Sequence, residues 1–351
     1  MTERSRKLSK VEFYSIDYIR VLAMLAVIFI HVRPFVQIDP AITFIINQKF
    51  SRFAVPFFLI TAGYFYGIKF LSSADLTGWF KKRMKALIRI YLLWTFLYSL
   101  PYLDLWVSVL MQGQFLRWLQ MVLIAPPQVH MWYLPAFIMA TLWIYLVHSY
   151  FPMARKRLLI ISMILLLIGI LGDGYYHLTN QLWPINWILT IFGNTRNGIF
   201  FAIPYVSLGY LISFVSLETL ALKKRWLWGG FFISVILVIF EGSLIDTLDI
   251  FYDANLLFSH LPLTIFILLL CLVYPNFMKG SRVSYQAPYT FGVYLNHMIV
   301  IVILYIFPIN VLRSNVFFEI IYPFLILRLS LNWSKAMYLS DSKWMNMWVK
   351  L

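Results

Sequence analysis

The chain has 351 residues, of which 62% are hydrophobic and only 12% are charged, and its formal net charge is +15. Soluble domains contain about 45–50% apolar and about 25% charged residues, so this composition excludes a soluble globular protein, a disordered chain and a coiled coil. The single cysteine, Cys271, excludes an internal disulfide and a cysteine-based metal site. We therefore predict an all-α integral membrane protein.

The basic net charge by itself could indicate nucleic-acid binding. Aromatic residues, however, make up 19% of the chain, and such a content suits the two water interfaces of a bilayer. We expect the lipid bilayer as a partner and no nucleic acid.

A membrane-spanning helix needs about 20 mostly apolar residues. Ten segments meet this description, and we predict that they form one domain over residues 1–351, a single bundle with a central channel: 16–35, 52–70, 86–104, 131–150, 157–172, 197–215, 226–241, 256–274, 288–307 and 316–333. Polar residues interrupt the apolar stretch 105–125, which we interpret as an interfacial or re-entrant helix. The first segment lacks a small-residue cleavage site, so we expect a retained anchor.

The distribution of basic residues predicts the orientation, because Lys and Arg concentrate in cytoplasmic loops. With both termini in the cytoplasm, the outer segments hold only six of the 29 Lys and Arg residues: Arg33, Lys49, Arg52, Arg117, Arg196 and Arg313. This alternation holds at every loop and indicates an even number of spans. We predict a multi-pass protein of the plasma membrane.

Ionisable side chains inside spans are costly and by default mark a functional site. Arg20 and His31 in the first predicted span are eleven residues apart, about 20° beyond three full turns and about 16 Å along the helix axis. They therefore share one helix face, with Arg20 near the inner membrane edge and His31 in the outer half. Asp17 precedes Arg20 by three residues and can pair with it. A purely structural interpretation stays open, in which Arg20 snorkels to the interface and His31 only ends the span.

The Asp-x-x-Arg and Arg-x10-His patterns of this span resemble acyltransferase family 3, membrane proteins that acylate polysaccharides and other envelope molecules. Further motifs follow in collinear order up to about residue 310: Val55-Pro56-Phe57-Phe58 with Gly63-Tyr64; Lys81–Arg89; His130-Met131-Trp132-Tyr133-Leu134; Thr195-Arg196-Asn197-Gly198 with Leu208-Gly209-Tyr210; and Phe291-Gly292-Val293-Tyr294-Leu295-Asn296-His297. Two positions depart from the family pattern. Ala62 stands where many members have Ser, and Ala86 occupies the first position of the family's Arg-x-x-Arg, of which Arg89 fits the second.

Members of this family are thought to move an acyl group, usually acetyl, from cytoplasmic acyl-CoA to a hydroxyl of an extracytoplasmic glycan. The resemblance implies an O-acetyltransferase that takes acetyl-CoA as its donor substrate and a glycan or lipid-linked glycan as its acceptor. Four basic residues would bind the phosphates of the donor: Lys82, Arg83, Lys85 and Arg89. A positively charged inner loop without any ligand would look the same.

We expect His31 to be the general base, with Arg20 and Asp17 beside it in the catalytic set, because a neutral imidazole can take the acceptor's proton. An acyl group that rests on His31 or on a nearby hydroxyl is the alternative. The remaining candidates would bind the acceptor or stabilise the oxyanion, or each could be structural: Arg196, His297, Tyr294, His130, Trp132, Tyr133 and Glu241. The histidines form no recognisable metal motif, so we expect no metal.

Two other functions fit part of this pattern. A transporter or flippase of a lipid-linked sugar also needs polar groups in its spans, but transporters often contain internal repeats, and the sequence shows none. Within acyl transfer, a larger acyl group such as succinyl, or an amino acid or lipid as the acceptor, stays open. The oligomeric state is not predicted.

Overall fold

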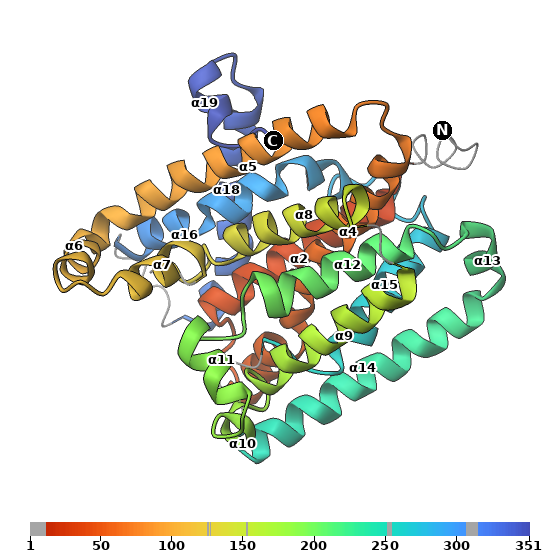
Figure 1. Cartoon of the computed structure of the whole chain (residues 1–351), viewed down its shortest axis with the longest axis horizontal. Helices are drawn as coiled ribbons and strands as arrows, with labels where there is room; N and C mark the ends of the chain where they lie inside the picture. The colour runs from red at the N-terminus through yellow and green to blue at the C-terminus, as the bar shows by residue number, and fades with distance from the viewer. Residues whose placement is uncertain (1–11, 125, 127, 152–153, 251–254, 307–314) are drawn as a thin grey trace.

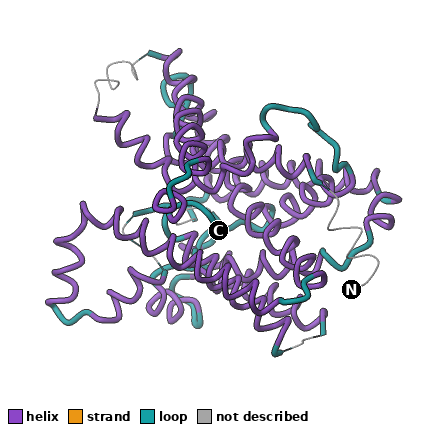
Figure 2. The backbone as a smooth tube through the Cα atoms, turned by 90° about the horizontal axis from the view of Figure 1, so that it is seen from above, coloured by secondary structure: helices purple, strands orange, loops and turns teal. Residues whose placement is uncertain are grey.

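The computed structural model describes residues 12–351 except 125, 127, 152–153, 251–254 and 307–314. Every regular element among these residues is a helix. Figure 1 shows the long helices packed beside one another as one bundle, and Figure 2 shows that loops and short turns join them.

Ten helices fall on the ten predicted spans: α2 (Tyr14–Val32), α4 (Ala54–Ser72), α5 (Leu76–Ser99), α8 (Tyr133–Ser149), α9 (Arg155–Leu171), α12 (Ile203–Ile212), α14 (Lys224–Thr247), α15 (His260–Val273), α16 (Thr290–Ile306) and α18 (Val316–Leu339). Six helical stretches are long and apolar enough to cross a membrane: Tyr14–Val32, Pro40–Ser72, Leu76–Met111, Lys224–Thr247, Ser284–Ile306 and Val316–Leu339. The other helices are shorter, so length supports a multi-pass protein, while ten spans and their orientation stay predictions.

Short helices connect the long ones: α3 (Pro40–Phe44), η1 (Ile45–Phe50), η2 (Ser51–Phe53), η3 (Leu100–Tyr102), α6 (Leu103–Met111), α7 (Phe115–Leu123), α10 (Tyr176–Thr179), α11 (Ile185–Phe192), η4 (Gly198–Ala202), α13 (Leu217–Leu222), η5 (Ser284–Tyr289) and α19 (Lys343–Met347). Figure 1 places α6, α7, α10 and α11 at one end of the bundle and α13 at the other. The stretch 105–125, predicted as one interfacial or re-entrant helix, contains most of α6 and all of α7, which are separated by a turn at Gly113 with φ 67°; residue 125 lies outside the described residues.

Three predicted spans differ clearly in their bounds from the helices of the structure, and the tenth, predicted to end at residue 333, continues as α18 to Leu339. The third was predicted to begin at residue 86, but α5 begins at Leu76, because the Asp75 side chain caps it by accepting a hydrogen bond from the Gly78 amide. The seventh was predicted to end at residue 241, but α14 continues to Thr247. It can do so because the Glu241 carboxylate is buried and accepts hydrogen bonds from the Phe258 and Ser259 amides.

Helices α4 and α12 cross with their backbones in close contact. A Cβ atom at Gly63 would lie 2.0 Å from the Val206 carbonyl oxygen, and one at Gly209 would lie 1.9 Å from the Ile60 carbonyl oxygen. Small residues allow membrane helices to approach in this way. The two glycine motifs noted in the sequence are therefore the two sides of one helix crossing, which positions the inner face of α4.

Candidate active site

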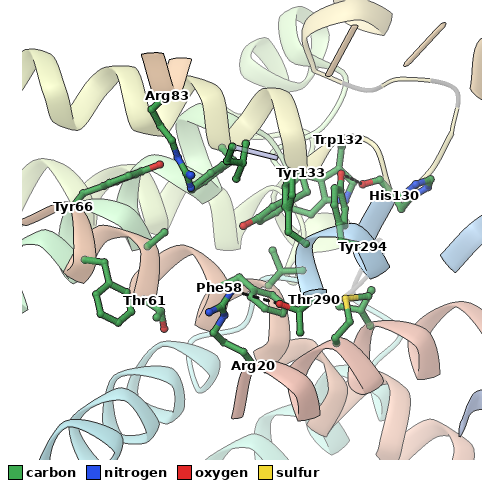
Figure 3. A pocket seen from close by; sticks show the side chains of 18 of the residues that line it. Arg20, Phe58, Thr61, Tyr66, Arg83, His130, Trp132, Tyr133, Thr290 and Tyr294 are labelled. Atoms are coloured by element: carbon green, nitrogen blue, oxygen red, sulfur yellow. Dashed lines mark hydrogen bonds between the residues drawn. The ribbon is translucent and has the colours of Figure 1, made fainter. Parts of the chain in front are cut away.

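A cavity of about 320 Å³ lies between α2, α4, α5, α8 and α16. Arg20, Arg83 and Thr290 line one end of it, and His31, His130 and Trp132 line the other. Figure 3 shows His130 and Trp132 on the right of the pocket, Arg83 at its upper left and Arg20 at its lower edge beside Thr290. Aromatic side chains form much of the wall between the two ends: Phe58, Phe65, Tyr66, Tyr133, Phe137, Phe291 and Tyr294. The shared face predicted for Arg20 and His31 is the face of α2 that borders this cavity.

The end of the cavity at Arg20 is cationic. Arg20 Nη1 lies 3.3 Å from Asp17 Oδ1, and its Nη2 donates to Thr290 Oγ1 at 3.4 Å. Arg83 reaches the same end from α5, and its Nε is buried without a hydrogen-bond partner. Two guanidinium groups from different helices therefore line this cavity, and each could hold an anionic group by charge-assisted hydrogen bonds.

The basic cluster predicted to bind the donor is divided by the structure. Lys82 and Lys85 are exposed and do not line the cavity, while Arg83 does. Arg89 is engaged elsewhere, because its Nε and Nη2 donate to the Met347 and Lys350 carbonyl oxygens at 3.1 and 2.9 Å.

Residues 343–351, which begin with α19, pack against α5 and reach the cavity. Trp94 Nε1 donates to the Trp348 carbonyl oxygen at 2.8 Å, and Leu351 forms part of the cavity lining. Arg89 and Trp94 together hold this segment in place. Nothing in the sequence pattern indicated this contact, since it joins residues about 250 positions apart.

The opposite end of the cavity brings three histidines together. The ring centroids of His31 and His297 are 5.3 Å apart, those of His130 and His297 are 5.1 Å apart, and those of His31 and His130 are 6.4 Å apart. They come from α2, α16 and the turn before α8. The sequence marked each as a candidate but could not show that they meet.

Two of these imidazoles are buried with unpartnered nitrogens. Neither ring nitrogen of His130 has a hydrogen-bond partner, and the Nε2 of His297 has none. His297 Nδ1 lies 3.0 Å from the Val293 carbonyl oxygen and 2.8 Å from that of Tyr294. Carbonyl oxygens only accept, so Nδ1 carries the proton and Nε2 is left as an acceptor.

The aromatic candidates surround this cluster. The Tyr294 hydroxyl donates to the His130 carbonyl oxygen at 3.1 Å, and the Tyr133 ring stacks on Phe137 with centroids 5.7 Å apart. Trp132 stacks on Phe201 at 5.3 Å, and the guanidinium of Arg196 lies 5.4 Å from the Trp132 ring. Arg196 does not itself line the cavity, but its guanidinium lies over Trp132, which does.

Glu241 lies outside the cavity lining. Its carboxylate accepts from the Tyr175 hydroxyl at 2.9 Å and from the amides of Phe258 and Ser259 at 2.9 and 2.7 Å. The Ser259 amide begins α15, so Glu241 ties α14 to the start of its neighbour. These hydrogen bonds indicate that the Glu241 carboxylate stabilises the packing of α14 against α15.

Sequence reasoning missed several residues of the site. Tyr98 packs its ring 4.7 Å from that of His130 and donates its hydroxyl to the Leu295 carbonyl oxygen at 2.7 Å. Thr290 and Thr61 line the cavity. An uncharged Tyr or Thr in an apolar span carries no signal of its own, so only the packing could reveal these three residues. Among the described residues, no group of three His, Cys, Asp or Glu side chains could hold a metal ion.

The geometry so far defines an all-helical membrane protein whose cavity joins a cationic end to a cluster of imidazoles. A family model described as an acyltransferase domain matches residues 13–333, so the chain belongs to acyltransferase family 3. This membership supports a membrane acyltransferase.

Curated relatives carry a different name. An amino-acid racemase of Enterococcus faecalis is 29% identical over 341 residues, which cover 93% of this chain and 47% of that protein. A serine/alanine racemase of Enterococcus gallinarum is 31% identical over 274 residues, which cover 72% of this chain and 36% of that protein. The chain thus spans less than half the length of these relatives. No solved structure matches the chain.

Proposed function

We propose that this protein transfers an acyl group, most simply acetyl, from acyl-CoA to a hydroxyl of an envelope glycan or lipid-linked glycan. The observation that carries the proposal is the single cavity with Arg20 and Arg83 at one end and His31 at the other. An anionic donor and a neutral nucleophile need these two environments at opposite ends of one passage. The plasma membrane is the proposed location, because the acceptor then lies across the bilayer from the cytoplasmic donor.

The cationic end would hold the phosphates of CoA. Arginine pairs with phosphate through two parallel hydrogen bonds, which lysine cannot reproduce. Arg83 lies one helical turn before Ala86, the position where the family pattern has its first arginine, and Ala86 is buried away from the cavity. We infer that Arg83 supplies the contact that Ala86 cannot. The pantetheine arm would then extend between the aromatic walls over the roughly 16 Å that separate Arg20 from His31 along α2.

The chemistry would occur at His31. No described residue donates to or accepts from its ring, so an incoming hydroxyl can use a ring nitrogen. His31 removes the hydroxyl proton, the oxygen attacks the thioester carbonyl carbon, and the C–S bond breaks so that its electron pair leaves with the CoA sulfur. Positioned bases of this kind contribute typically 10²–10⁴-fold to the rate.

The acceptor would enter at the imidazole end, beside Trp132, Tyr133 and Tyr294. The names of the racemase relatives favour an amino acid as a second candidate acceptor, because serine carries a hydroxyl that acyl-CoA can acylate. The glycan and the amino-acid hypotheses require the same donor site and the same general base. The two hypotheses are distinguished by supplying each acceptor separately to the same enzyme.

The test is acetyl transfer by protein purified into lipid nanodiscs. Labelled acetyl-CoA is supplied with crude envelope extract, and separately with free L-serine. The variants are His31→Ala and a control, His148→Ala, whose ring lies outside the cavity lining and pairs with the Tyr210 hydroxyl at 2.8 Å.

We expect label to reach one acceptor with wild type and with His148→Ala, and a loss of about 100-fold or more with His31→Ala. Equal labelling by His31→Ala and wild type would make His31 structural. If wild type did not bind acetyl-CoA at all, acyl transfer would be wrong, and transport of a lipid-linked sugar would become the better proposal.

A further inference from the structure

The cluster of His31, His130 and His297 contains more imidazoles than a single general base requires. His31 and His130 line the cavity, whereas His297 does not. His297 nevertheless lies nearer to each of the other two rings, at 5.3 and 5.1 Å, than they lie to one another, at 6.4 Å. His297 therefore lies outside the cavity lining, next to both His31 and His130.

The unpartnered nitrogens of this cluster require an explanation. A buried polar group left without a hydrogen bond costs about 1–3 kcal/mol, and most proteins avoid it. His130 and His297 leave three ring nitrogens in this condition, although only 3% of His130 and none of His297 is exposed. A catalytic role is one of the recognised reasons why such groups persist.

The tautomer of His297 determines what this residue can do. Its Nδ1–H is directed to the carbonyl oxygens of Val293 and Tyr294 in its own helix, so the Nε2 lone pair is directed away from them. Two imidazoles joined by an N–H···N bond of about 2.9 Å have ring centroids about 5 Å apart. The observed separations are therefore close to those of direct proton transfer, and a small rotation of either ring, or one water, would complete the contact.

No acidic side chain among the described residues forms a hydrogen bond or an ion pair with any of the three rings, so none holds a proton on one of them. The charged groups that act on His31 from neighbouring elements are the guanidinium groups of Arg52 and Arg196, both of which repel an added positive charge. The tyrosines packed on the rings, Tyr98 and Tyr294, are neutral hydrogen-bond donors to backbone carbonyls.

Building on the proposed acyl transfer, we propose that the three histidines form a proton path in which His297 carries the proton from His31 to His130. His31 takes the proton of the acceptor hydroxyl as the new C–O bond forms. The proton passes to Nε2 of His297, then to His130. His130 gives it to the CoA thiolate as the C–S bond breaks, so one proton enters and one leaves. His297 acts through its neighbours and is a positioning and relay residue.

The decisive variant is His297→Gln, because glutamine keeps hydrogen-bonding capacity and approximate size but cannot carry a proton. His148→Gln is the matched control. Acetyl transfer to the acceptor that wild type labels, and acetyl-CoA binding, are measured for each variant in nanodiscs. We expect His297→Gln to bind acetyl-CoA within about two-fold of wild type and to transfer acetyl about ten-fold or more slowly. A rate within three-fold of wild type would overturn the relay, while the role of His31 would stand.

A second measurement separates proton transfer from packing. His297→Ala leaves a space the size of an imidazole, which small azoles can fill. Imidazole and pyrazole have nearly the same size, but pyrazole is a much weaker base. If imidazole restores the acetyl-transfer rate of His297→Ala and pyrazole does not, the relay is supported. If both azoles restore this rate equally, the relay is overturned. If neither azole restores the rate, the result for His297→Gln decides. A wild type that labels no acceptor would contradict the proposed function instead.

Discussion

Replacing Gly209 by alanine tests the helix crossing that positions the cavity. The added Cβ would lie 1.9 Å from the Ile60 carbonyl oxygen and 2.8 Å from the Tyr64 amide nitrogen, whereas favourable non-bonded contacts begin near about 3.5 Å. Both neighbours are backbone atoms, so α4 and α12 must move apart. Overpacking of this kind costs up to about 3 kcal/mol, and the better helix propensity of alanine returns about 1 kcal/mol. The expected net loss of stability is about 2 kcal/mol.

The assay is thermal unfolding in detergent, with Gly229→Ala as the control. Gly229 lies in α14, where an added Cβ meets no atom within 4 Å, so its replacement should be neutral or stabilising. We expect Gly209→Ala to lower the Tm by several degrees and to reduce acetyl transfer, because α4 carries Thr61 and Ala62 of the cavity wall. A Tm of Gly209→Ala equal to that of wild type would refute the close backbone contact.

Two further predictions separate residues of the cavity from residues outside it. Arg83→Gln should raise the KM for acetyl-CoA about ten-fold, because a hydrogen bond to a charged group contributes about 1.5–3 kcal/mol, while Lys82→Gln should change it less than two-fold. Equal KM values for the two variants would remove Arg83 from the donor site. Glu241→Gln should lower the free energy of unfolding by about 1–3 kcal/mol, since the amide cannot accept every hydrogen bond that the carboxylate now receives. Its acetyl transfer per folded molecule should match wild type, and a selective loss of transfer would place Glu241 in the reaction.

Sequence reasoning predicted the helical elements well because hydropathy is a local property. Each of the ten predicted spans coincides with a helix, and the errors lie at the helix ends. At Asp75 and Glu241 a side-chain hydrogen bond accompanies the longer helix, and α18 also continues beyond its predicted end, to Leu339. The common cavity face of Arg20 and His31 was also predictable. It depends only on the 3.6-residue period of a single helix.

The partition of the basic cluster could not be predicted in the same way. Lys82, Arg83 and Arg89 lie within two turns of α5, yet one is exposed, one lines the cavity and one binds residues 347 and 350. Their roles depend on which neighbour covers each side of α5. That neighbour is distant in sequence and leaves no trace in the local pattern.

The sequence by itself determined the class of this protein, the position of its helices and the pairing of a cation with an imidazole on one helix face. The tertiary structure alone decided that His130 and His297 join His31, that Arg83 joins Arg20, and that Glu241 serves the packing of α14 on α15. The physical reason is that partition into a bilayer and helical periodicity act over one turn to one span. A catalytic cluster instead depends on side-chain packing between helices that are far apart in the chain.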